Sequence, residues 1–225
     1  FGAALVALTI DETGMAKTVE RKLAVARRLY DLAVTEVGLP PHALIFDPLT
    51  FTLATGDPET ANAAVETLEA LRQLKVALPG VLTSLGVSNV SFGLTPPARR
   101  ALNSVFLYQA VAAGLDMAIV NPAQITPYPD IPAEVREAAD ALIFNRDPDA
   151  LARYLSCFEG TGSTPAGAEV STALPAHEQL FQAILHRRRE GVEALVEGSL
   201  EHFAPLAVLN EILLPAMKEV GDRFG

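Results

Sequence analysis

The sequence has no tryptophan, one cysteine and few basic residues for its length of 225. Lysine and arginine number 17 against 27 aspartates and glutamates, which gives a formal net charge of −10 and a pI near 4.8. A nucleic-acid surface needs clustered basic side chains to neutralise phosphates, so this balance argues against nucleic acid as a partner. We interpret the one basic run, residues 187–189, as the solvated edge of a helix.

The scarcity of cysteine and of long apolar runs indicates a cellular location. Cys157 has no second cysteine with which to form an internal disulfide, which favours a reducing compartment. No apolar run reaches the roughly 18 residues of a membrane span, and no signal-peptide pattern opens the chain. We therefore expect a cytoplasmic protein with no membrane partner. Because Phe1 is not a methionine and directly precedes a strand-like run, we also expect a piece of a longer protein.

Hydrophobic residues make up 50% of the chain and aromatic residues only 6%, a composition that favours a helix-rich α/β fold. Short apolar runs alternate with longer segments of helical periodicity up to about residue 158. Four such units with strands apolar throughout predict a parallel sheet covered by helices, either a (β/α)8 barrel or an open doubly wound sheet. No glycine-rich phosphate loop follows a strand, which weakens a nucleotide-binding version. The predicted strands are 4–10, 43–46, 81–85 and 117–120, and the predicted helices are 18–38, 57–78, 95–113, 132–144 and 148–158.

The chain is predicted to have two folded parts. Residues 159–175 are small, polar and rich in proline and glycine, which is typical of a linker. Residues 176–225 contain helical segments interrupted by Gly191 and Pro205. We therefore divide the chain into an α/β part over 1–158, a linker over 159–175 and an all-α part over 176–225.

Each predicted strand passes into its loop with an aspartate or an asparagine: Asp11, Asp47, Asn89 and Asn121. The carboxyl ends of barrel strands open on one face, which carries the active site, so these side chains are expected to converge there. Together they suit a neutral, planar ligand rich in hydrogen-bonding groups. The alternative, that they cap helices or form Asx turns, stays open for each of them.

The loop over 84–93, SLGVSNVSFG, contains no charged residue, unlike a typical surface loop. We interpret it as shaped to lie against a flat ligand, with Asn89 as its directional contact. The four histidines are not spaced as one metal site, and the sequence contains no Gly-x-Ser-x-Gly nucleophile elbow. A metal site and acyl transfer are therefore not predicted.

The motifs VSNVSFG, LIFDPLTF and LDMAIVNPAQI resemble the pterin-binding barrel of the cobalamin-dependent methionine synthase family. The C-terminal stretch LNEILLPAMKEVGDRFG is similar to the helical cap that covers cobalamin in that family. Both matches occur in the family's order, separated by a linker. The resemblance implies an α/β fold that is the C-terminal half of a (β/α)8 TIM-type barrel, followed by the start of an all-α cap.

The resemblance also implies an activity and site residues. Enzymes of this family transfer the methyl group of 5-methyltetrahydrofolate to cob(I)alamin and then to homocysteine. By this likeness Asp47 hydrogen-bonds the pterin and Asn89 reaches toward N5, and the two together assist proton delivery to N5. Asp11 and Asn121 fall at similar strand ends and would also contact the pterin. Phe224 matches the aromatic residue that packs over the corrin of the cobalamin cofactor.

Several parts of the family's pattern are not in this sequence. Only four βα units occur, and the Asp-x-His-x-x-Gly loop that ligates cobalt is missing. The homocysteine module, where zinc is expected, and the reactivation module are missing too, so these modules are expected partners. A half-barrel exposes its inner face, so we expect this piece to be unstable and inactive alone. The alternatives are a stand-alone pterin-dependent methyltransferase and a non-catalytic corrinoid-binding scaffold; the phosphate-binding pattern of dihydropteroate synthase is not found.

Overall fold

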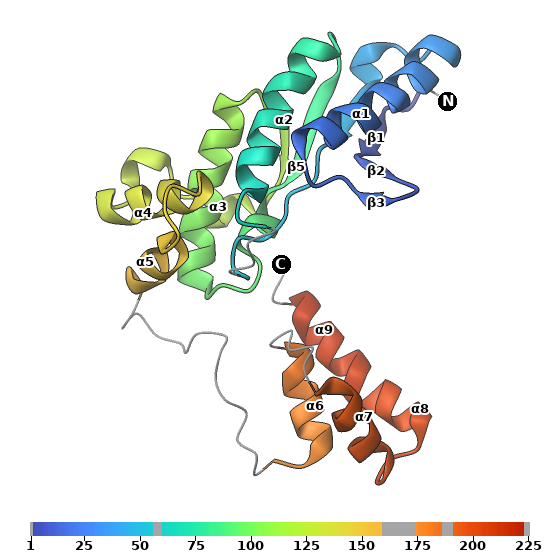
Figure 1. Cartoon of the computed structure of the whole chain (residues 1–225), viewed down its shortest axis with the longest axis vertical. Helices are drawn as coiled ribbons and strands as arrows, with labels where there is room; N and C mark the ends of the chain where they lie inside the picture. Colours follow the sequence, from blue (N-terminus) through green and yellow to red (C-terminus); the bar gives the residue numbers. More distant parts are fainter. Residues whose placement is uncertain (1, 56–59, 159–173, 186–190, 223–225) are drawn as a thin grey trace. The chain divides into compact units, whose positions relative to one another are not determined.

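The computed structural model describes residues 2–55, 60–158, 174–185 and 191–222 of the chain. They belong to two compact units, residues 1–162 and residues 163–225 (Figure 1). Because Phe224 and most of the predicted linker lie outside the described residues, the structure gives no account of them.

A four-stranded parallel sheet forms the centre of the first unit, with the strand order β1-β4-β5-β6. The order in space follows the order in the chain, whereas a doubly wound sheet reverses its direction at a switch point. The predicted parallel α/β fold is therefore confirmed, and the arrangement is the barrel type of the two left open. Its strands are β1 (Leu5–Leu8), β4 (Leu44–Asp47), β5 (Leu82–Gly86) and β6 (Met117–Ile119).

A small antiparallel hairpin follows β1 and was not predicted. Its strands are β2 (Ile10–Asp11) and β3 (Gly14–Met15), whereas the sequence pattern predicted one strand over 4–10. The backbone of Gly14 has φ +108°, a conformation that glycine adopts at little cost and that allows the chain to reverse here. The hairpin carries Asp11 beyond the end of β1.

Helices cover one side of the sheet. Consecutive helices α1, α2, α3 and α4 contact one another in chain order, and Figure 1 shows α1, α2 and α3 beside the strands. α2 begins at Ala63 rather than at residue 57, because residues 60–62 form a turn before it. The helical segments are α1 (Val19–Tyr30), the π-helical Asp31–Glu36, the 3-10 helical Pro41–Ala43, α2 (Ala63–Ala77), the 3-10 helical Val87–Ser91, α3 (Pro96–Ala112), the 3-10 helical Pro122–Gln124 and Tyr128–Asp130, α4 (Ala133–Ile143) and α5 (Ala150–Ser156).

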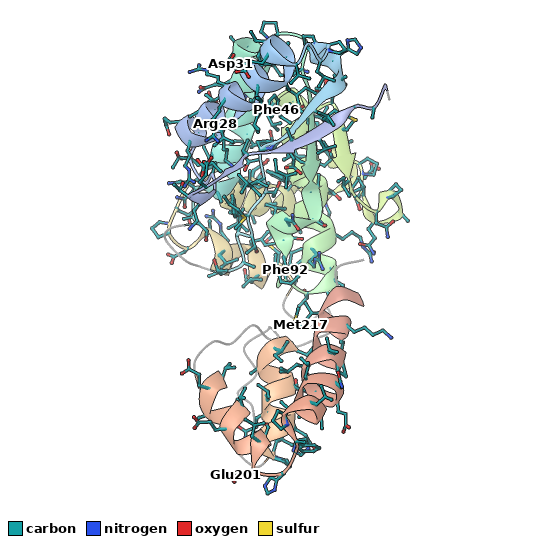
Figure 2. All side chains as sticks on the ribbon, turned by 90° about the vertical axis from the view of Figure 1, so that its right-hand side faces the viewer. Arg28, Asp31, Phe46, Phe92, Glu201 and Met217 are labelled. Carbon is teal, nitrogen blue, oxygen red and sulfur yellow. The ribbon has the colours of Figure 1, made fainter. Side chains whose placement is uncertain are left out.

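The opposite side of the sheet carries no helix among the described residues. In β4, Leu44 and Phe46 are buried against α1 and α2, and Figure 2 labels Phe46. Alternation along the strand therefore places Ile45 and Asp47 on the other side. The register of β1 with β4, of β4 with β5 and of β5 with β6 places alternate residues of β1 and β6 on the same side as these two. We call this surface the helix-free face, and its exposed apolar residues are Val6 (58% exposed), Leu8 (44%), Met117 (38%) and Ile119 (68%).

The second unit is helical. Its core contains Leu180, Val208 and Ile212. None of the described helices of either unit is both long enough and apolar enough to span a membrane. The helical segments are α6 (Ala176–Leu185), α7 (Val192–Leu200), α8 (Pro205–Ala207), the π-helical Val208–Leu213 and α9 (Leu214–Asp222).

Candidate functional site

Two loops meet at the carboxyl edge of the sheet. The backbone N–H of Leu53, after β4, donates to the carbonyl of Val90, after β5, at 2.9 Å. The Thr52 hydroxyl donates to the carbonyl of Phe92 at 2.7 Å, and Figure 2 marks Phe92 at this end of the unit. The loop that follows Asp47 and the loop that contains Asn89 are therefore hydrogen-bonded to each other at the carboxyl edge of the sheet.

Asp47 is the last residue of β4, and it lies partly buried on the helix-free face. Its Oδ1 accepts a hydrogen bond from the backbone N–H of Leu49 at 2.8 Å, which closes an Asx turn. Burial raises the pKa of Asp47 above its ordinary 3.8, although the Leu49 N–H and the Lys22 ammonium act in the opposite direction. A carboxylate held in this way can accept hydrogen bonds from a ligand at the edge of the sheet.

Lys22 lies beneath this turn, and sequence reasoning missed it. Its side chain is completely buried, its Nζ donates to the carbonyls of Pro48 and Leu49, and it lies 5.2 Å from the centre of the Phe51 ring. Burial lowers the pKa of Lys22 from 10.5 to about 8, while the carboxylates of Glu66 and Asp47 oppose that shift.

The sequence did contain a signal for Lys22. It falls three residues after Val19 and four before Ala26, two buried residues on the apolar stripe of α1. A lysine at such a position has to be paired or hydrogen-bonded inside the protein, because burying an unpaired charge is costly. Its position in the stripe is therefore evidence of a buried partner.

Asn89 lies in the 3-10 segment after β5, and it is exposed. Its amide lies against Gly86: a Cβ added at Gly86 would be 3.1 Å from the Asn89 Nδ2. Glycine at this position thus leaves room for the amide beside the backbone. The predicted contact of Asn89 with a flat ligand stays a prediction.

A buried polar network supports this loop from below. The Ser91 hydroxyl, fully buried, donates to Asn103 Oδ1 at 2.7 Å, and it also lies 3.2 Å from the carbonyl of Ser88. Arg99, on α3, donates through Nε to Ser91 Oγ at 3.3 Å and lies 5.9 Å from the centre of the Phe92 ring. The loop has no charge of its own, but a cation from the next helix packs against it.

Asn103→Ala is expected to lower the free energy of unfolding by about 1 kcal/mol, because the buried Ser91 hydroxyl would lose its shorter hydrogen bond and keep the one to the Ser88 carbonyl. Chemical denaturation of the full-length protein measures this change. Asn62→Ala is the matched control, since the Asn62 side chain is exposed and accepts from another exposed amide, that of Asn145. The control should change stability by less than about 0.5 kcal/mol. Equal effects of the two changes would contradict a supporting role for Asn103.

Asp11 and Asn121 each make a local hydrogen bond. Asp11 accepts from both the backbone and the hydroxyl of Thr13 and from Arg21, and these contacts, Thr13 first, lower its pKa to about 2. Asn121 follows β6, is exposed, and accepts from the Ala123 N–H at 3.1 Å. These are the turn and cap contacts of the alternative interpretation. Contact of either residue with a pterin stays a prediction.

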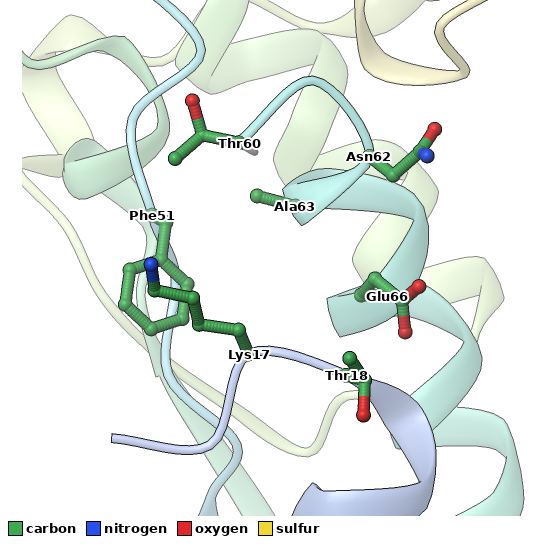
Figure 3. A pocket seen from close by; sticks show the side chains of 7 residues that line it. All are labelled: Lys17, Thr18, Phe51, Thr60, Asn62, Ala63 and Glu66. Carbon is green, nitrogen blue, oxygen red and sulfur yellow. The ribbon is translucent and has the colours of Figure 1, made fainter. Parts of the chain in front are cut away.

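A cavity of about 130 Å³ lies between the start of α1 and the start of α2 (Figure 3). Phe51, whose ring also lies near Lys22, forms one wall, and Glu66 forms another while its Oε2 accepts from the Val19 N–H at 2.6 Å. Asp47 and Asn89 do not line the cavity, so the cavity lies next to the candidate site but is not part of it. It is lined by Lys17, Thr18, Phe51, Thr60, Asn62, Ala63 and Glu66.

The second unit exposes apolar side chains along one continuous helical run. They belong to α8, the π-helical segment and α9, where large apolar residues normally pack inward. In the described part of the chain, no three histidine, cysteine or acidic side chains are grouped to hold a metal ion. The exposed residues are Leu206 (67%), Leu209 (44%), Leu214 (54%) and Met217 (58%).

Comparison with known proteins adds two family matches. Residues 1–121 match the family described as pterin binding enzyme, and residues 176–225 match the B12 binding domain. The chain is 44% identical to methionine synthase of Mycobacterium leprae and 43% identical to methionine synthase of Mycobacterium tuberculosis. Each alignment covers all of this chain but only 19% of the relative, so the chain spans about a fifth of the length of these curated relatives. The predicted resemblance is confirmed.

Proposed function

The chain belongs to the pterin binding enzyme family, and on this premise we propose that it forms part of a cobalamin-dependent methyltransferase of the methionine synthase type. The proposed reaction transfers the methyl group of 5-methyltetrahydrofolate to cob(I)alamin and then to homocysteine. One observation carries the proposal: a pterin-family sheet and a B12-binding helical segment occur in one chain, which aligns throughout with relatives named methionine synthase.

In this proposal Asp47 and Asn89, the two polar residues at the carboxyl edge, have different roles. The Asp47 carboxylate accepts hydrogen bonds from the amino and ring N–H groups of the pterin. Asn89 lies near N5, where its amide oxygen can accept from the amine as N5 becomes protonated. A tertiary amine is a poor leaving group, so this stabilisation lowers the barrier to methyl departure. Bound cobalamin supplies the nucleophilic cobalt, so the protein needs no nucleophile of its own.

The remaining assignments belong to the same proposal. The folate part covers 1–158 and the cap part 176–225, joined by a linker over 159–175. Asp11 and Asn121 add pterin contacts, and the apolar run of the second unit, with Phe224, covers the corrin. The homocysteine module with its zinc, the cobalamin-binding module and the reactivation module are the other parts of the assembly. The single cysteine supports a cytoplasmic location.

A single-turnover experiment on the full-length protein tests this function. Addition of 5-methyltetrahydrofolate to enzyme reduced to cob(I)alamin is expected to convert the cob(I)alamin spectrum to that of methylcobalamin, with one folate consumed per cobalt. Tetrahydrofolate, which lacks the methyl group, is the control and should leave the spectrum unchanged. Folate-independent methylation, or no methylation, would show that the folate part is a scaffold.

A further inference from the structure

We infer that Lys22 is a positioning residue for the folate site: its buried ammonium holds the turn after β4 in the shape that presents the Asp47 carboxylate on the helix-free face. This inference rests on the proposed function. It concerns a residue of α1, whose side chain reaches the turn from the helix-covered side of the sheet.

The backbone of the turn explains why a cation is needed there. Successive carbonyls of an extended chain point to opposite sides, yet those of Pro48 and Leu49 both accept from Lys22 Nζ. Leu49 makes this possible by adopting φ +65°, a left-handed conformation that is unfavourable for a residue with a Cβ. The ammonium therefore stabilises a left-handed backbone conformation that leucine disfavours.

The same residue connects Lys22 to Asp47. The carbonyl of Leu49 accepts from Lys22, at 3.2 Å, and its N–H donates to Asp47 Oδ1, at 2.8 Å. A change in the Lys22 contact would thus rotate the peptide groups that hold the carboxylate. Leu49 also accepts from the Thr67 hydroxyl at 2.9 Å, so part of the turn would remain anchored without the lysine.

Stability alone is a weak reason for a charge at this position. Buried ion pairs and buried charges are often no more stabilising than an apolar residue of the same shape. The charged groups that face Lys22 come from two other elements, Asp47 on β4 and Glu66 on α2, and Glu66 is held by the Val19 N–H. The positive charge next to Asp47 favours the ionised carboxylate, which is the form that accepts hydrogen bonds from a pterin.

Lys22→Met tests the inference in the full-length protein, because methionine fills similar space without donating. The dissociation constant for 5-methyltetrahydrofolate, measured by calorimetric titration, is expected to rise about tenfold, equivalent to the loss of one charge-assisted hydrogen bond. Leu49→Gly in the Lys22→Met background should recover at least part of the affinity, because glycine adopts the left-handed turn without help. A lysine that only packs α1 would show no such recovery.

Lys75→Met is the matched control. Lys75 also binds a backbone carbonyl, that of Val81 at 3.3 Å, and a carboxylate, that of Asp116 at 2.8 Å, but it does so at the amino ends of β5 and β6. Lys75→Met should lower the unfolding temperature and leave folate affinity within about twofold of the wild-type value. Wild-type affinity in Lys22→Met would overturn the inference and leave the proposed function intact. A wild-type protein that does not bind 5-methyltetrahydrofolate would overturn both, and failure of Leu49→Gly to recover affinity would overturn the positioning role.

Discussion

Asp47→Asn is expected to weaken 5-methyltetrahydrofolate binding by about a hundredfold in the full-length protein, equivalent to about 2.7 kcal/mol. The loss follows from charge rather than from shape. Asparagine is nearly isosteric, and its amide oxygen can still accept from the Leu49 N–H that holds the side chain now. What disappears is an ionised acceptor for the N–H groups of the pterin. Calorimetric titration of wild type and variant under one buffer and temperature measures the difference.

The same variant should not be destabilised, which separates binding from folding. Burial raises the pKa of Asp47 in the folded protein above 3.8, so ionising it costs more in the folded state than in the unfolded state. The stability that the protonated form contributes is fully present below pH 3.8 and is lost as the pH rises through the folded pKa. Asparagine removes this dependence, so the unfolding free energy at neutral pH should stay equal or rise.

Asp116→Asn is the control for this prediction. Asp116 lies directly before β6, at the other end of the sheet, and accepts from Lys75 and from both the backbone and the hydroxyl of Thr83. Its loss should lower stability without changing folate affinity. If Asp47→Asn instead lowers the free energy of unfolding and leaves folate affinity unchanged, Asp47 is a structural turn residue and the proposed site is wrong.

The sequence pattern predicted the sheet well for a local reason. Strands of a parallel sheet are short and apolar throughout, so β4 was predicted at 43–46 and occurs at Leu44–Asp47. Because parallel strands run in one direction, the polar residues that follow them were predicted to lie at one edge of the sheet. Asp47 and Asn89 thus reach the same edge without any knowledge of side-chain contacts.

The contacts that shape the site could not be predicted in the same way. Lys22 is separated from Leu49 by 27 residues, and its hydrogen bond forms only because α1 packs over the turn after β4. The hairpin that displaces Asp11 depends on Gly14 and on the link from Arg21 to Asp11. The periodicity of apolar residues can mark Lys22 as buried, but it identifies neither the partners of Lys22 nor the hairpin.

Asn89→Ala is expected to slow methyl transfer from folate to cob(I)alamin by about a hundredfold to a thousandfold, the usual effect of deleting one transition-state hydrogen-bonding group. Asn89 is exposed and its removal leaves no buried group unpaired, so stability should change by less than about 0.5 kcal/mol. Folate affinity should change by less than about tenfold, because the contact strengthens only as N5 gains its proton. Single-turnover absorbance of cob(I)alamin gives the rate, and titration gives the affinity.

Gly86→Ala provides a second way to disturb the same amide. The added methyl group would lie 3.1 Å from the Asn89 Nδ2, so the amide has to move while its chemistry is retained. The rate should fall between wild type and Asn89→Ala. Asn121→Ala should have a smaller effect than Asn89→Ala, because the Asn121 oxygen is already bonded to the Ala123 N–H. Normal transfer by Asn89→Ala would contradict a catalytic role for Asn89 in the loop over 84–93.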